Sequence, residues 1–251
     1  MVRSVGVLAL VAAPMALSFV GGGRSMRVTK RRLEGAAADF VADSFGTSPE
    51  ESAAIEARII EASPQPVAQL LRVAAAPAAG ADDDDRQLLE ARCKEVREEL
   101  AARCDGLAAL GLSASELKRT VTRVPEVLSY TPARAAKAAA AIKERLSLDD
   151  VEFKKKIALR LPQALGLDYA ADVAPELDAL KEGLGLDDAE LRKVVLGVPQ
   201  CLGLRYAEDI QPAVARLSEE LGSKQNAKAE VLRKPAALDL DVRGSKLGSA
   251  R

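Results

Sequence analysis

Apolar residues recur at helical spacing in front of several prolines along the chain. Before Pro125 they are Leu117, Val121 and Val124, which fall on one face of a helix. Proline disfavours the α conformation of the residue before it and has no N–H to continue the helix. The pattern therefore predicts amphipathic helices that end at or just before each proline. The same spacing occurs before Pro162 and Pro199, with the apolar residues Phe153, Ile157, Ala158, Leu161, Leu191, Val194, Val195 and Val198.

These prolines belong to a repeat. The nine residues LPQALGLDY at Leu161–Tyr169 return as VPQCLGLRY at Val198–Tyr206, 37 positions later. We interpret the repeated phrase as the corner between two helices, with the second helix predicted at 133–145, 174–183 and 212–221. The repeating prolines are Pro125, Pro162, Pro199 and Pro235, and the leucine that stands three residues after each, an expected anchor of a tight turn, is Leu128, Leu165, Leu202 and Leu238.

A period of this length is typical of a helical solenoid. A two-helix unit cannot bury its apolar stripe alone, so neighbouring units must stack. We predict an all-α protein, a superhelical solenoid of either hand with about four units. Residues 86–112 have apolar positions in helical register and are interpreted as the second helix of a unit whose first half has diverged. The composition agrees, since 48% of residues are hydrophobic and only 3% are aromatic, with alanine and leucine favouring helices.

The N-terminal residues have the composition of a targeting leader. Residues 1–18 follow the layout of a secretory signal peptide, and residues 19–34 contain Arg, Ser and Gly with no acid before Glu34. Together they resemble the bipartite leader of nucleus-encoded plastid proteins in algae with complex plastids. We therefore expect a plastid location, with the mitochondrion as an alternative and a secreted protein as a competing interpretation. No stable membrane span is expected in the mature protein, because the apolar run is short and interrupted by Pro14.

The remaining boundaries follow from composition. Residues 35–84 are rich in Ala, Pro and acids, and are expected to be a linker with possible short helices, one of them starting at Ser48 with Glu51 at capping-box spacing. The repeat domain is expected at 85–242, and residues 243–251 form a tail.

The chain offers little for catalysis. It has no histidine, and its three cysteines, Cys93, Cys104 and Cys201, form no C-x-x-C pair. We expect no enzymatic activity, no cofactor and no metal site, and we interpret the cysteines as core residues.

The repeats at Leu110–Tyr130 and Leu184–Leu204 resemble those of the mitochondrial transcription termination factor (mTERF) family. The shared features are Leu-Gly-Leu at the start, a charged helix, a hydrophobic residue before proline, and leucine three residues later. The resemblance covers roughly residues 86–242. It implies a helical superhelix that binds organellar DNA or RNA and regulates transcription or its termination.

Charge is unevenly distributed despite a formal net charge of −1. Residues 1–32 contain six basic and no acidic groups, residues 33–85 contain two basic and eleven acidic groups, and residues 86–251 contain 28 basic and 26 acidic groups. In units 1 and 2 basic residues stand seven, six and two positions before the proline. Unit 3 has Gly197 at the last of these positions and unit 4 has Ala229 at the second. Stacking would align the charges into a ladder suited to phosphates. The candidate nucleic-acid-binding residues are Lys118, Arg119, Arg123, Lys155, Lys156, Arg160, Arg192, Lys193, Lys228 and Arg233.

Two alternatives to these assignments stay open. The charged faces are equally consistent with ordinary solvated helix surfaces, which would leave the solenoid as a protein-interaction or structural module of the organelle. Tyr169 and Tyr206 recur at one position of consecutive units and could stack on unpaired bases, or could pack between helices with the hydroxyl at the rim. DNA, RNA and other organellar proteins are thus the expected partners.

Overall fold

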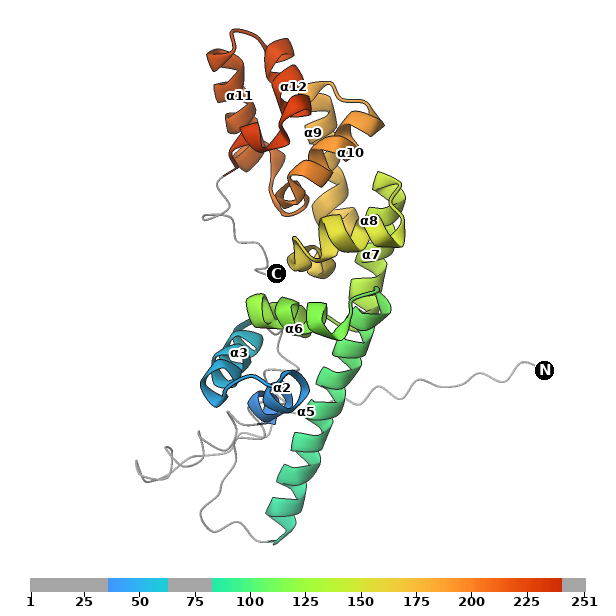
Figure 1. The fold of residues 1–251 in the computed structure, drawn as a ribbon, viewed down its shortest axis with the longest axis vertical. Helices are drawn as coiled ribbons and strands as arrows, with labels where there is room; N and C mark the ends of the chain where they lie inside the picture. The colour runs from blue at the N-terminus through green and yellow to red at the C-terminus, as the bar shows by residue number, and fades with distance from the viewer. Residues whose placement is uncertain (1–35, 63–82, 241–251) are drawn as a thin grey trace, which may run out of the picture.

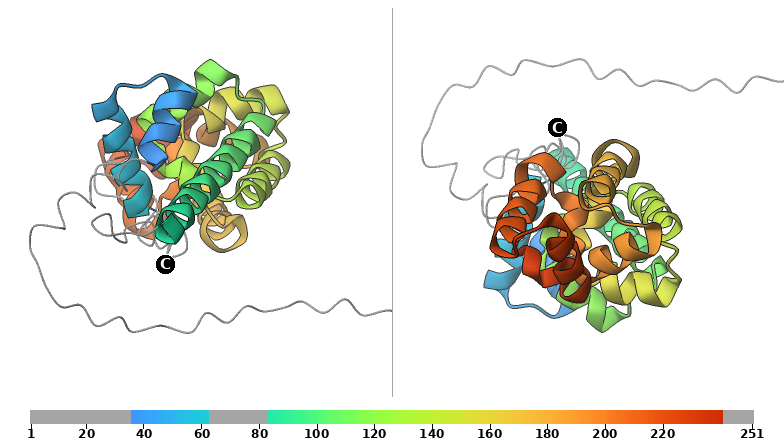
Figure 2. Two further views of the ribbon diagram at one scale, coloured as in Figure 1. Left: turned by 90° about the horizontal axis from the view of Figure 1, so that it is seen from below. Right: turned by 90° about the horizontal axis from the view of Figure 1, so that it is seen from above.

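A computed structural model describes residues 36–62 and 83–240, and every regular element in these two ranges is helical. The helices stack in pairs along one long axis, as a solenoid (Figure 1). Seen along that axis, successive units overlap in projection (Figure 2). The all-α helical repeat is therefore confirmed. The predicted leader at 1–34 and the tail at 243–251 lie outside the described residues.

Each complete unit consists of a first helix, a short 3-10 turn that begins at the repeating proline, and a second helix. Two of the second helices begin with one π turn. Unit 1 is α6 (Ala114–Arg123), η1 (Pro125–Ser129) and α7 (Pro132–Leu146). Unit 2 is α8 (Asp150–Phe153) with η2 (Lys154–Ala158), η3 (Pro162–Gly166), and η4 (Tyr169–Val173) with α9 (Ala174–Leu184); unit 3 is α10 (Asp188–Gly197), η5 (Pro199–Gly203), and η6 (Tyr206–Ile210) with α11 (Gln211–Glu220).

Unit 4 is shorter than the others in the described part of the chain. It consists of α12 (Lys224–Arg233) and η7 (Pro235–Leu238). Its proline lies in the same corner as those of the other units, and Leu238 is buried there like its counterparts. The array is therefore irregular at this end.

The proline corner forms as the sequence predicts. In unit 1 the N–H of Val124 donates to the carbonyl of Thr120 at 2.8 Å, which is the last helical bond before Pro125. The proline then occupies the first position of the 3-10 turn, where its missing N–H costs no hydrogen bond. Leu128 and its counterparts Leu165, Leu202 and Leu238 are all at most 1% exposed, so the predicted anchors are confirmed.

The first helix of unit 2 contains one residue more than its neighbours. Pro162 follows the N-cap residue Asp149 by 13 positions, whereas in units 1 and 3 this separation is 12 positions. The extra residue is accommodated by the π turn η2, in which the N–H of Leu159 donates to the carbonyl of Lys154 at 3.0 Å. The insertion leaves Lys155 and Lys156 as consecutive exposed residues on this helix.

The folded body starts earlier than the predicted residue 85. Helices α2 (Ala36–Phe45) and α3 (Pro49–Ala62) pack onto α5 (Asp83–Ala109) and η1, and bury Val41, Ile55 and Ile59 in the common core. The predicted capping box of α3 is present, with Ser48 N–H donating to Glu51 at 3.0 Å and Glu51 N–H donating to Ser48 Oγ at 3.2 Å.

Helix α3 supplies the diverged first half of the unit that ends in α5. It packs against the 3-10 turn of the following unit, and α10 packs in the same way against η7. Residues 36–62 are therefore part of the solenoid, and the interpretation of 35–84 as a linker is corrected for this segment. Its acidic, alanine-rich composition hid the short apolar stripe that enters the core.

The core is one continuous cluster of aliphatic side chains from Val41 to Leu238. Cys104 and Cys201 are buried in it, and burial raises the pKa of their thiols to about 11 and about 12. Cys93 is half-buried against the same core. Among the described residues no helix is long and apolar enough to cross a membrane.

Candidate nucleic-acid interface

The N-caps of the first helices give a common origin for comparing units. Ser113, Asp149, Asp187 and Ser223 each accept a hydrogen bond from the backbone N–H three residues later, which fixes where the helix begins. Residues at equal distance from the cap are therefore structurally equivalent. Five positions after the cap stand Lys118, Lys154, Arg192 and Lys228, and six positions after it stand Arg119, Lys155, Lys193 and Ala229.

Cations at the fifth position mostly join one unit to the next. Three of the four contact the glutamate three residues after the cap of the preceding unit: Lys154 with Glu116 at 3.4 Å, Arg192 with Glu152 at 2.7 Å, and Lys228 with Glu190 at 2.8 Å. Arg192 and Lys228 also donate to the carbonyls of Leu146 (3.0 Å) and Gly185 (2.6 Å). Arg192 and Lys228, which were predicted to bind phosphate, thus contact residues of the preceding units.

Hydrogen bonds favour the charged form of two of these glutamates, Glu190 and Glu116. The hydrogen bond from Lys228, together with that from the Asp187 backbone, lowers the pKa of Glu190. Glu116 also has a lowered pKa, chiefly because it accepts hydrogen bonds from Ser113, with Lys154 contributing less. Glu116, Glu152 and Glu190, near the start of the first helices, are thus each in contact with a cation of the next unit.

Two of the three arginines predicted near the helix ends also contact the neighbouring unit. Arg123 Nη2 donates to the carbonyl of Leu159 at 2.6 Å. Arg160 donates from Nη1 to Leu196 at 2.8 Å and from Nη2 to Gly197 at 3.2 Å. These carbonyls belong to the last turn of the next first helix, where no intrahelical donor is available. Both arginines remain exposed, and neither forms an ion pair with a described residue.

Arg233, the third of these arginines, has a different environment. Its guanidinium contacts Glu230 of its own helix at 2.6 Å, and this contact raises the pKa of Arg233. In unit 3 the corresponding position is occupied by Gly197, where an added Cβ would stand 2.5 Å from the ring of Pro235. The arginine contact between units therefore ends at unit 3, because the helix backbone packs directly on the next proline.

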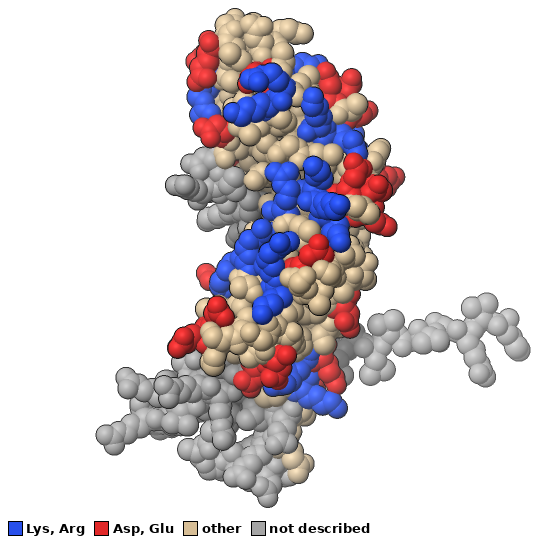
Figure 3. All heavy atoms as spheres, viewed as in Figure 1, with Lys and Arg blue, Asp and Glu red and all other residues tan. Residues whose placement is uncertain are grey.

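Five of the ten predicted cations make no side-chain hydrogen bond or ion pair with any described residue, and all five are exposed on the first helices. We call these residues the basic row: Lys118, Arg119, Lys155, Lys156 and Lys193. Figure 3 shows Lys and Arg side chains as a band along the face on which α6, α8, α10 and α12 lie.

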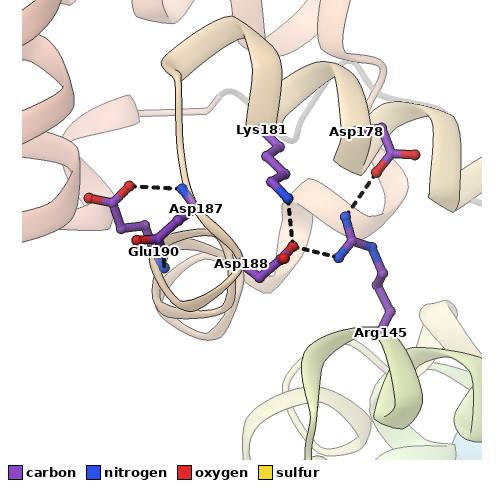
Figure 4. A network of polar contacts seen from close by, with 6 residues as sticks. All are labelled: Arg145, Asp178, Lys181, Asp187, Asp188 and Glu190. Carbon is purple, nitrogen blue, oxygen red and sulfur yellow. Dashed lines mark hydrogen bonds and ion pairs between the residues drawn. The ribbon is translucent and has the colours of Figure 1, made fainter.

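Aspartates beside the band are paired with cations from the second helices. Asp188, the first residue of α10, accepts from Lys181 at 2.8 Å and from Arg145 at 2.9 Å, and Arg145 also contacts Asp178 at 2.9 Å (Figure 4). Lys143 contacts Asp150 at the equivalent place one unit earlier, at 2.8 Å. The hydrogen bonds from Lys181 and then Arg145 lower the pKa of Asp188. These aspartates are therefore paired with cations of the second helices and not with the basic row.

Both candidate stacking tyrosines pack between helices, as the alternative interpretation proposed, but the hydroxyl of Tyr169 is buried without a hydrogen-bond partner among the described residues and does not lie at the rim. Tyr169 and Tyr206 are partly buried against the core, and desolvation raises the pKa of each hydroxyl. Tyr206 stands so close to Gly183 of α9 that a Cβ there would overlap its hydroxyl. Neither ring is presented for stacking on a base.

Some equivalent residues of the interface are recognised only when the units are aligned on their N-caps and not on their prolines. Counting from the proline aligns Lys155 with Arg192, because the inserted residue of unit 2 shifts the register by one. Lys154, the actual counterpart of Arg192, was missed for this reason. Arg58 of α3 was missed too, although it donates to the carbonyl of Arg123 at 3.4 Å as Arg123 does to Leu159. Counting from the capping residues Ser113, Asp149 and Asp187 would have identified Lys154 in the sequence.

No group of three or more His, Cys, Asp or Glu side chains in the described ranges is placed to hold a metal ion. The arrangement supplies exposed positive charge with regular spacing, which suits contacts to a polyanion.

Comparison with models of protein families gives a match. Residues 144–244, which include units 2, 3 and 4, match the family model described as mTERF. No curated protein matches the chain. The match supports the family resemblance for the C-terminal units, and it includes seven of the ten candidate cations that were taken from the sequence. The two units before residue 144 are linked to this segment by their helical architecture and capping pattern.

Proposed function

We propose that this protein is an mTERF-like solenoid that binds DNA or RNA through the phosphate backbone, without catalysing a reaction. The observation that supports the proposal most directly is the basic row, whose five cations stand five to seven positions after the N-caps, are exposed and have no carboxylate partner in the described structure. Lysine and arginine contacts to phosphates provide affinity without reading sequence. Neither the first-helix positions nor the packed tyrosines supply an obvious set of base-reading groups.

Binding by the full-length chain is the first test. Fluorescence anisotropy with labelled duplex DNA, duplex RNA and single strands should give saturable binding that weakens with salt. The triple variant Arg119→Glu, Lys155→Glu, Lys193→Glu should bind at least about tenfold more weakly because phosphate contacts become repulsive. Lack of wild-type binding at low salt contradicts the proposal.

A matched control separates position from total charge. Arg134 and Lys137 on α7 and Lys224 on α12 are exposed, and their side chains have no hydrogen bond or ion pair with a described residue. Reversing these three charges changes the net charge by the same amount as reversing the row. The control variant should retain affinity within about threefold if local contacts dominate. Equal losses in both triple variants would show that the row has no special role.

We propose further that the protein acts in an organelle and regulates transcription or its termination. The support is the mTERF match together with the composition of residues 1–34, which favours a plastid and leaves the mitochondrion as the alternative. A fluorescent fusion to the full chain, compared with one that lacks these residues, tests the location. Crosslinking and sequencing of nucleic acid from the isolated organelle then identifies the bound sites and the transcripts affected.

A second candidate function has specific support. Half of the ten predicted cations contact other residues of the protein, which suits a protein-interaction or structural module without nucleic-acid contact. In that case the full chain binds no duplex or single strand, and the row-reversed triple variant recovers the same proteins from the organelle as wild type. Loss of nucleic acid from the recovered complexes on row reversal favours the first function instead.

A further inference from the structure

We infer that Arg123 and Arg160 are pre-organised phosphate ligands, oriented by the carbonyls of the neighbouring unit. This inference rests on the proposed function, because it concerns how the same face holds a nucleic-acid backbone. It separates these two arginines from the basic row, whose side chains are free to move. The argument depends on which N–H groups are used, on the net charge around each guanidinium, and on a comparison with Arg58.

Each arginine has unused donors after its contacts within the protein. A guanidinium carries five N–H groups in a planar fork. Arg123 donates to Leu159 from Nη2, and Arg160 donates from Nη1 and Nη2 to Leu196 and Gly197. The Nε atoms of both side chains, and Nη1 of Arg123, have no hydrogen-bond partner among the described residues. One edge of the fork is thus fixed on the protein while another edge is open to solvent.

The charge of these arginines is not neutralised by a carboxylate. Arg58 shows the contrast, because it contacts the carbonyl of Arg123 and also Glu126, at 2.7 Å and 3.0 Å. Glu126 directly follows the repeating proline of its unit, and the equivalent residues in the next two units are Gln163 and Gln200. The glutamines are neutral, so Arg123 and Arg160 keep a full positive charge beside the helix end. Arg58 does not.

These arginines also remove an obstacle to anion binding. The C-terminal end of a helix has a partial negative charge on its unpaired carbonyls, which repels phosphate. A guanidinium bonded to those carbonyls offsets that charge and presents donors to a phosphate beside them. Arg119 and Arg123 are four residues apart on α6 and share one face, as do Lys156 and Arg160 in unit 2. A backbone bound to the basic row passes within reach of both fixed arginines.

Arginine and lysine are not equivalent in this arrangement. A lysine keeps the charge, but its single ammonium cannot hold a planar contact to a carbonyl while offering a second, fixed pair of donors to phosphate. Charge-preserving replacements therefore test the inference without changing the electrostatic field. The chain offers three matched sites: Arg123 is carbonyl-bound and unneutralised, Arg119 is unneutralised without a carbonyl partner, and Arg58 is carbonyl-bound and neutralised.

The experiment measures binding of labelled duplex DNA and duplex RNA by the full-length wild type and by Arg123→Lys, Arg119→Lys and Arg58→Lys at several salt concentrations. Thermal unfolding of each variant is recorded alongside. We expect Arg123→Lys to bind at least about fivefold more weakly with an unchanged salt dependence, because charge is kept and orientation is lost. Arg58→Lys should bind within about twofold of wild type, and Arg119→Lys should lose less affinity than Arg123→Lys because its side chain has no fixed orientation to lose. Arg160→Lys should repeat the result of Arg123→Lys.

Several outcomes overturn the inference. Equal affinity of Arg123→Lys and wild type shows that only charge matters at this position, while leaving the proposed function intact. A fall in unfolding temperature for Arg123→Lys and Arg58→Lys alike, without loss of affinity, shows that both arginines serve only to join units. Absence of binding by the wild type removes the proposed function itself, and the inference with it.

Discussion

At the scale of single residues, close contacts between units require particular side chains at particular places. An added Cβ at Gly166 would stand 2.3 Å from the ring of Tyr130, which belongs to the preceding unit. Burial raises the pKa of Tyr130 to about 12, consistent with a ring held in the interface. The pattern of apolar and polar residues in the sequence does not indicate that this glycine is essential. Its role depends on a neighbour 36 positions away and could be recognised only once the units were stacked.

Gly166→Ala should destabilise the protein by about 1–3 kcal/mol, because the tyrosine ring must shift out of a packed interface. Urea denaturation followed by circular dichroism measures the change. In a Tyr130→Leu background the same glycine substitution should cost less, since the clashing ring is absent. Equal costs in the two backgrounds would show that Tyr130 does not account for the glycine.

Asp188 provides a pH-dependent contact between units. Its pKa is lowered in the folded protein by Lys181 and Arg145, so it contributes stability that is present above the unfolded pKa, about 3.9 for an aspartate. This contribution is lost as the pH falls through the lower, folded pKa. The loss of stability on acidification should therefore be smaller in Asp188→Asn than in wild type, although the variant is less stable at neutral pH.

The urea midpoint of each protein, measured from neutral pH down to about pH 2, tests this prediction. Glu182→Gln is the matched control, because Glu182 is exposed on α9 and its side chain has no ion pair among the described residues. The prediction is wrong if Asp188→Asn shows the same acid dependence as wild type.

At the scale of helices, local signals were sufficient where a helix end is determined by its own residues. The proline corners, the capping box of α3 and the second helices follow from proline sterics, cap chemistry and apolar spacing. The position of α3 was not predictable in the same way. Ile55 and Ile59 form a short stripe whose partner surface, η1, is far away in sequence. In the sequence, the only sign of the π turn of unit 2 is one additional residue between the N-cap and the proline.

Packing of α3 into the solenoid predicts that its apolar residues stabilise the whole domain. Ile59 is fully buried, and Ile59→Ala should lower the free energy of unfolding by about 2–5 kcal/mol through lost burial and a remaining cavity. Ala57→Gly, an exposed position on the same helix, should cost about 1 kcal/mol. An unchanged unfolding transition in Ile59→Ala would contradict the assignment of α3 to the folded body.

At the scale of the whole molecule, surface charge is determined by contacts between units. The sequence placed all ten candidate cations on the first helices, and the structure confirms this for nine of them, while Arg160 lies in the turn just after η2. Which of them are free could not be predicted, because Lys228 and Arg192 find their glutamates 38 and 40 positions away in the preceding unit. Only the stacked array shows that the sixth position after the cap is free in each of the three units that carry a cation there.

The ends of this row make a further prediction. Ala54 stands six positions after the cap of α3, and Ala229 stands six positions after the cap of α12. Both are exposed. Ala54→Lys and Ala229→Lys should each lengthen the row by one cation, strengthen binding at low salt and steepen the salt dependence by about one unit. Ala140→Lys on α7, exposed but away from the row, is the control. Equal gains from all three substitutions would mean that added charge acts without regard to position.

The salt dependence of duplex binding by the full-length chain tests the central claim most directly. The slope of log K against log salt should become less steep by about three units in Arg119→Ala, Lys155→Ala, Lys193→Ala, since each lost phosphate contact removes about 0.9 units on duplex DNA. Arg134→Ala, Lys137→Ala, Lys224→Ala should leave the slope near that of wild type. Equal slopes for wild type and the row variant would contradict the assignment of these cations to phosphate contacts.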